Sequence, residues 1–143
     1  MIIPDVNLLI YAVIKGVPVH DKARLWLLRL MDGPEPVGFG TLILFGFIRV
    51  ATNPRMIQPP MAVDRALELV DGWLARPHVR LIHPGPEHLP IAFQLLRDAG
   101  TAGNLTSDAQ IAALAIEYQA EVHSNNPDFA RFSGLRWRNP LVP

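Results

Sequence analysis

The chain has 143 residues, half of them hydrophobic, so one domain with a sizeable core is expected over residues 1–143. Its 13 Lys and Arg residues balance its 13 Asp and Glu residues, so any nucleic acid must be held by a local patch or a metal ion rather than by bulk charge. The chain has no cysteine, no apolar run long enough to span a membrane and no signal-peptide pattern, which excludes disulfides and fits a cytoplasmic protein.

Strand-like and helix-like segments alternate along the chain. In the first half we expect, in order, a strand at residues 1–4, helices at 7–13 and 19–31, a strand at 37–39 and a helix at 41–51. In the second half we expect a helix at 64–75, a strand at 79–82, helices at 87–99 and 107–118, a strand at 121–123, a helical turn at 129–132 and a strand at 135–138. This alternation favours a mainly parallel sheet covered by helices on both faces.

Asp5 is the most informative residue of the sequence. It lies between the apolar residues 1–4 and a second apolar segment at residues 6–13, which only Asn7 interrupts. A carboxylate in such surroundings is costly to desolvate unless something offsets its charge. Two interpretations remain open, because a strand end is where ligands bind in an open α/β sheet, whereas aspartate is also a favoured helix cap.

Asp108 is the second candidate acid. It is predicted to lie in the first turn of the helix at residues 107–118, after the capping residues Thr106 and Ser107. Compensation of the helix dipole would explain an acid there and would lower its pKa. The crowded polar residues 104–108 favour the other interpretation, in which the carboxylate faces a cleft.

A third polar group follows the predicted strand at residues 121–123. Asn125, Asn126 and Asp128 there would meet the other strand-end acids in one crevice, where oxygen ligands suit Mg²⁺ or Mn²⁺. The alternative is an Asx turn that leads into the helical turn.

Two arginines and one asparagine are further residues to place relative to the predicted site. Arg49 lies on the apolar segment 41–51, so we expect it to be buried and paired with a carboxylate. Arg55 is a weaker candidate for the site, and Asn7 is expected either to orient Asp5 or to cap the helix that follows.

Five short blocks carry a family resemblance over nearly the whole chain. They are residues 3–12 with Asp5, residues 46–55 from Gly46 to Arg55, residues 100–109 with Asp108, residues 124–132 with Asn126 and Asp128, and residues 135–141. In this order they resemble PIN-domain ribonucleases, specifically VapC-type toxins of type II toxin–antitoxin systems.

The resemblance implies a three-layer α/β/α sandwich with a central, mainly parallel sheet, and Mg²⁺-dependent cleavage of RNA by a metal-activated water. The family's acids fall on Asp5 and Asp108, the expected Mg²⁺ ligands, and its later acidic positions fall on Asn126 and Asp128. These four residues are the candidate catalytic set, and Mn²⁺ is an alternative cofactor. The resemblance also implies a cognate antitoxin and a homodimer, with surfaces on the helices at residues 19–31 and 41–51.

Two positions depart from the family pattern. Gly46 stands where the family usually has Glu, no acid occurs between residues 36 and 63, and Asn126 replaces an acid. One Mg²⁺ needs only one or two carboxylates, whereas a second cation needs more charge. The alternative function is therefore a catalytically weakened PIN domain that mainly binds RNA or its antitoxin. A phosphoacceptor receiver-like domain is disfavoured, because it would need paired acids after the first strand and a late lysine.

Overall fold

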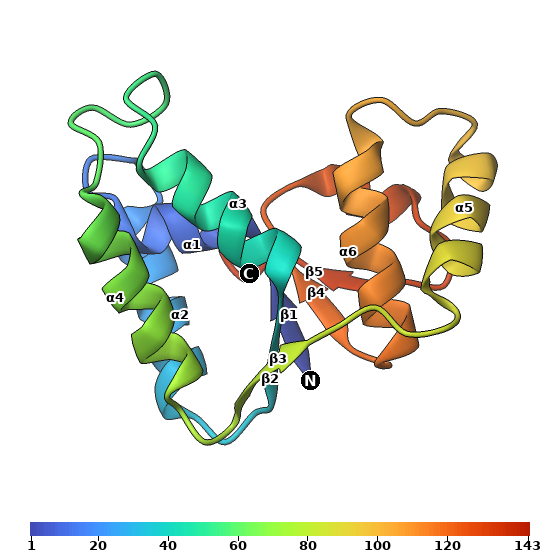
Figure 1. Ribbon diagram of the computed structural model, residues 1–143, viewed down its shortest axis with the longest axis horizontal. Coiled ribbons are helices and arrows are strands. Elements are labelled where there is room, and N and C mark those ends of the chain that lie inside the picture. Colours follow the sequence, from blue (N-terminus) through green and yellow to red (C-terminus); the bar gives the residue numbers. More distant parts are fainter.

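The structure, a computed structural model, describes residues 1–143 and is built on one parallel sheet (Figure 1). The five strands lie in the order β3-β2-β1-β4-β5, and every pair is parallel. Their bounds are β1 Ile2–Pro4, β2 Val37–Gly40, β3 Val79–Ile82, β4 Glu121–His123 and β5 Arg136–Arg138. The first strand in sequence is thus the central strand, and β3 and β5 are the two edges.

Helices cover both faces of the sheet, which confirms the predicted α/β/α sandwich. Figure 1 shows α1 to α4 on one side of the strands and α5 and α6 on the other. Their bounds are α1 Val6–Val13, α2 His20–Asp32, α3 Thr41–Ala51, α4 Val63–Leu74, α5 His88–Ala99 and α6 Leu105–Glu117, with a 3-10 helix, η1, at Pro127–Arg131. None of these helices combines the length and apolar character needed to cross a lipid bilayer.

The elements agree with the sequence-based expectations except near the late polar residues. Helix α6 begins at Leu105, two residues earlier than predicted, because Leu105 packs into the core with 4% of its surface exposed. Thr106 and Ser107 therefore lie inside the first turn, and their predicted role as caps was wrong. The helical turn also begins earlier than predicted, because Asn126 caps it and Pro127 suits its first position.

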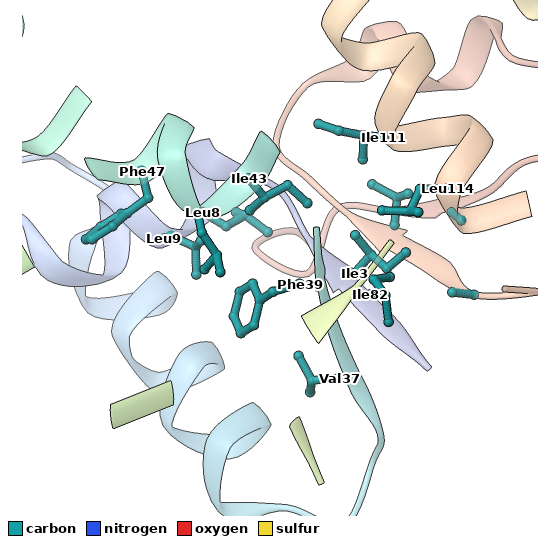
Figure 2. Close-up of a cluster of buried hydrophobic side chains, with 14 of the residues drawn as sticks. Ile3, Leu8, Leu9, Val37, Phe39, Ile43, Phe47, Ile82, Ile111 and Leu114 are labelled. Atoms are coloured by element: carbon teal, nitrogen blue, oxygen red, sulfur yellow. The ribbon is translucent and has the colours of Figure 1, made fainter. Parts of the chain in front are cut away.

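The core joins both helical layers to the sheet. Side chains alternate along β2, so Phe39 points toward α4 and stacks on Trp73 with ring centroids 5.8 Å apart. Phe47 of α3 meets the same indole edge-on at 4.9 Å. On the opposite face, a Cβ at Gly40 would lie 2.8 Å from Leu114 of α6, so glycine permits the close approach of that helix. Figure 2 shows Phe39, Phe47 and Leu114 among the buried side chains that converge from both sides of the strands.

Gly46 lies where α3 crosses α1. A Cβ at this buried position would stand 2.8 Å from a methyl group of Val6, which is a closer approach than real Cβ atoms make. Valine is stiff at χ1, so it cannot easily turn away. The glycine is thus required by helix packing, and a longer side chain at this position would push α3 away from α1.

Gly46→Ala is expected to lower the free energy of unfolding by about 1–2 kcal/mol, because overpacking outweighs the helix-propensity gain. Gly72→Ala in α4 is the matched control, since nothing lies within 4 Å of a Cβ there, and it should raise stability by about 0.5–1 kcal/mol. Urea denaturation measures both. Most of the stability lost in Gly46→Ala should be regained when Val6 is also changed to Ala. Equal gains in stability from Gly46→Ala and Gly72→Ala would contradict the close packing at Gly46.

Candidate active site

Asp5 lies at the carboxyl end of the central strand and caps α1, with only 7% of its surface exposed. Its Oδ1 accepts a hydrogen bond from the Val6 amide at 2.7 Å, and its Oδ2 accepts one from the Ser124 hydroxyl at 2.6 Å. Burial raises the pKa of Asp5, and these two hydrogen bonds oppose that rise. The helix-cap interpretation is therefore confirmed, and the interpretation of Asp5 as a ligand, which its place at the strand-end edge allows, stays a prediction.

Ser124 organises this edge of the sheet. Its fully buried hydroxyl oxygen accepts hydrogen bonds from the Asn7 amide group at 3.2 Å and from the Asn126 backbone at 3.0 Å. Because both contacts are N–H donors, the single hydroxyl proton is directed to Asp5. Asn7 also accepts from the Asn125 backbone at 3.4 Å, so it orients Asp5 through Ser124 rather than directly.

Sequence reasoning named the residues around Ser124 and missed Ser124 itself. The available signal was a small hydroxyl residue placed directly between a predicted buried strand and two asparagines. At the end of a strand in a parallel sheet, such a side chain meets the residue that ends the neighbouring strand.

Asp108 is the fourth residue of α6, and its carboxylate lies in the field of two other acids. Burial raises its pKa to about 6, and the charges of Asp5 and Asp128 add to that rise. The expectation of a lowered pKa from the helix dipole was therefore wrong, because desolvation and like charges outweigh the dipole at this depth. The charge of Asp5 thus acts on Asp108, and the prediction that the two acids form one site stays a prediction.

Asn126 joins Asp108 to the beginning of η1. Its Oδ1 accepts the backbone N–H of Asp128 at 3.0 Å, so its amide nitrogen faces Asp108 Oδ2 at 3.2 Å. The amide thus offers Asp108 a donor, and its oxygen is already used by the cap. Asp128 is exposed and acts on Asp108 through its charge rather than through a hydrogen bond.

The arginines named from the sequence do not join the site in this way. Arg49 is exposed and has no carboxylate within 4 Å, so the prediction of a buried, paired arginine was wrong. The buried face of α3 is formed by other residues, among them Ile43 and Phe47. Arg55 is also exposed, and only its backbone N–H is engaged, by Asn53 at 2.9 Å.

Asp5 and Asp108 are the acids that a divalent cation would use at this edge, and they are few for two cations. No group of three or more Asp, Glu, His or Cys side chains is arranged to hold a metal ion. Neither Asp5 nor Asp108 forms an ion pair with Lys or Arg, so their mutual repulsion is unrelieved by the protein. One or two carboxylates are enough for Mg²⁺, which keeps several of its waters.

Comparisons with known proteins agree over almost the whole chain. A family model described as PIN domain matches residues 2–135. "Ribonuclease VapC33" of Mycobacterium tuberculosis (strain ATCC 25618 / H37Rv) is 48% identical over 141 residues, which is 99% of either chain. Among solved structures, VapBC2 from Rickettsia felis, bound to a promoter DNA fragment, has a TM-score of 0.70 at 21% identity and covers 97% of this chain and 98% of that one. Mycobacterium tuberculosis VapC20, described as a sarcin-ricin loop cleaving toxin, has a TM-score of 0.67 at 18% identity, with 95% and 99% covered.

The raised pKa of Asp108 predicts a pH-dependent stability in metal-free protein. The stability tied to its protonated form is fully present below the ordinary pKa of 3.8 and is lost as the pH rises through about 6. Asp108→Asn should therefore raise the free energy of unfolding by about 1 kcal/mol above pH 6, after allowance for solvent screening of a half-exposed group, and should give no gain below pH 3.8.

Denaturant titrations in a chelator at several pH values measure this difference. Asp71→Asn, at an exposed position on α4, is the control and should show no such pH dependence. A gain from Asp108→Asn that is equal at all pH values would contradict the electrostatic cause.

Proposed function

The chain belongs to the PIN-domain family, among the VapC-type ribonucleases, and from that premise we propose that it is a Mg²⁺-dependent endoribonuclease, the toxin of a type II toxin–antitoxin pair. The observation that carries the proposal is the meeting of Asp5 and Asp108 at the carboxyl edge of the sheet, where their charges are coupled and unpaired. Relatives named as ribonucleases, 48% identical over the full length, support the same activity.

Asp5 and Asp108 would hold the Mg²⁺ ion, and Mn²⁺ could replace it. When bound, the cation would supply Lewis acidity toward a phosphate oxygen and would lower the pKa of a bound water toward neutral. The protein contributes the orientation of its two carboxylates. Ser124 fixes one oxygen of Asp5, and Asn126 donates to one oxygen of Asp108, so each carboxylate keeps lone pairs for the cation.

Asn126 and Asp128 are proposed to act beside these two ligands. Asn126 restrains Asp108 and begins η1, which presents Asp128 at the surface. Asp128 adds negative charge at the edge without the desolvation cost that Asp5 bears, because it is exposed. In these roles, Asn126 positions Asp108. Asp128 shapes the electrostatic potential around the substrate phosphate.

An antitoxin partner and a homodimer are also proposed. A hollow of about 390 Å³ between α2 and α4 is lined by apolar side chains, including Leu27, Met31 and Trp73, and also by the basic side chains of Lys15, Arg24, Arg65 and Arg76. This mixed lining suits a protein segment that carries both apolar and acidic side chains. Separately, α3 exposes Phe45 at 70% of its surface, and α5 exposes Phe93 at 50%. Large exposed aromatic side chains of this kind favour burial against a second copy. Structure neighbours described as VapBC2 and VapBC-1 support the proposal that this chain has an antitoxin partner.

Asp5→Asn and Asp108→Asn are each expected to lower the rate of RNA cleavage by about 100-fold or more, because each removes a cation ligand. Cleavage of a structured RNA with Mg²⁺ or Mn²⁺ gives the rate, and calorimetric titration of the cation gives its affinity. Asp71→Asn is the control and should retain both. Full activity of the Asp5→Asn variant would contradict the proposal, as would a wild type that binds neither cation.

A weakened PIN domain that mainly binds RNA or antitoxin is the second candidate function, and Asn126 is the observation that favours it. Asn126→Asp restores an acid beside Asp108 and should raise cation affinity by about 10-fold, with further coupling of the acids. If wild type is inert and Asn126→Asp cleaves RNA, the weakened function is correct. If wild type cleaves and Asn126→Asp changes the rate little, the two carboxylates are sufficient.

A further inference from the structure

A basic cleft lies on the α2 face of the sheet, along its β4–β5 edge. It encloses about 420 Å³, and the residues that line it include Lys22, Trp26 and Arg29 of α2 and His123 and Arg138 of the strands. A second hollow of about 440 Å³ adds Arg136. The residues common to both hollows are Ile2, Glu35, His123 and Arg138. The two hollows therefore adjoin, and together we call them the basic cleft.

The cations of the basic cleft are largely unpartnered. Lys22, Arg29 and Arg138 are exposed, and none has a carboxylate within 4 Å or a side-chain hydrogen bond. By contrast, Arg76 elsewhere on the surface pairs with Asp32 at 2.9 Å. In a chain with no net charge, unpaired cations gathered in one hollow create a local positive potential.

The acids of the cleft offset this potential only in part, because Glu35 has a cationic partner and Glu121 is outnumbered by the cations of the cleft. Glu35 lies 3.7 Å from the ammonium group of Met1, and Glu121 lies 2.8 Å from Nε2 of His123. Trp26 donates its indole N–H to Nδ1 of His123 at 3.1 Å, so that nitrogen carries no proton and Nε2–H donates to Glu121. His123 is therefore neutral, in keeping with the lowering of its pKa by burial.

The fold presents the cations as two facing rows. Lys22 and Arg29 are seven residues apart on α2, so they share one face at a spacing of about 10 Å. Arg136 and Arg138 share one face of β5, because side chains alternate along a strand. Arg138 pairs in register with His123, whose ring meets Trp26 of α2, so the β5 row lies on the α2 face of the sheet.

The basic cleft ends beside the candidate active site. The backbone N–H of Ser124 donates to the carbonyl of Arg138 at 3.1 Å, and the same residue holds Asp5 through its hydroxyl. Asn139, next to Arg138, donates to the side chain of Asn125 at 2.8 Å. Arg138, at the carboxyl end of β5, is therefore one hydrogen bond from the residue that holds Asp5.

We propose that the basic cleft binds backbone phosphates of the substrate RNA outside the scissile bond, with Lys22, Arg29 and Arg138 as the contacts. The proposal rests on the ribonuclease function proposed above. Arginine forks and a lysine without acidic partners suit phosphates, and Arg138 lies at the strand end next to the residue that holds Asp5. RNA is favoured over an acidic protein segment because the unpartnered cations stand in two rows along the cleft, which suits the repeated phosphates of a nucleic-acid backbone.

The test compares two charge-matched double variants. Arg29→Gln/Arg138→Gln removes two cations of the basic cleft, and Arg80→Gln/Arg97→Gln removes two exposed cations from β3, at the opposite edge of the sheet, and from α5. Cleavage of a long structured RNA should show a KM raised about tenfold or more in the first variant, with kcat within about twofold. The dependence of log KM on log salt should flatten by about 0.7 for each lost phosphate contact. The control variant should behave as wild type.

Further arms separate the possible outcomes. A short RNA that spans only the scissile region should show no change in KM, and Arg29→Lys/Arg138→Lys should restore most of the affinity for the long RNA. If wild type cleaves and both double variants keep the wild-type KM and salt slope, the basic cleft is not an RNA surface and the ribonuclease function still stands. If the cleft variant loses antitoxin binding and keeps RNA binding, the occupant is a protein and the proposal is overturned.

RNA binding without added metal gives a readout that is independent of cleavage. Fluorescence anisotropy with the long RNA should show weaker binding by the cleft variant than by wild type or the control variant. An inert wild type that shows this difference would overturn the proposed ribonuclease function and leave the cleft assignment intact. Equal binding by all three proteins would overturn the cleft assignment. Unfolding midpoints of the two double variants should match, because every changed side chain is exposed.

Discussion

The hydrogen bond from Ser124 to Asp5 is the interaction on which the site depends. It joins the ends of two neighbouring strands and holds a carboxylate that is almost fully buried. Without a donor of this kind, the carboxylate would have to be protonated or exposed to water, because burying an unpartnered charge is very costly. The contact is available only because β1 and β4 are parallel neighbours, so that their carboxyl ends meet at one edge.

The sparse charge of the site follows from the same arrangement. Two carboxylates without cationic partners raise the pKa of Asp108, and Asn126 offers that group a neutral donor in place of another negative charge. Position 46 has no room for an acidic side chain, because α3 and α1 touch there. The edge therefore carries the coupled charges of Asp5 and Asp108, and the packing of α3 against α1 explains why position 46 holds glycine rather than a longer side chain.

The surfaces around this edge differ in chemistry although α2 contributes to two of them. Toward α4, the helix presents Leu27, Leu28 and Met31 together with Arg24 to a hollow of mixed apolar and basic character. Toward β5, it presents Lys22 and Arg29 to the basic cleft, which also contains Arg138. One helix of 13 residues thus contributes to two hollows of different composition, because a 3.6-residue repeat places different residue types on its faces.

The element order, the parallel sheet and the positions of Asp5 and Asp108 follow from the sequence, because hydrophobic period and strand-end position are local properties. Other features of the site arise only when distant segments pack together. Ser124 became a partner of Asp5 through a contact across 119 positions, and the pKa of Asp108 rose because burial and distant charges outweighed the local helix dipole. Arg49 faces water because the buried side of α3 is chosen by its neighbours. These properties depend on long-range packing and electrostatics, which no local pattern encodes.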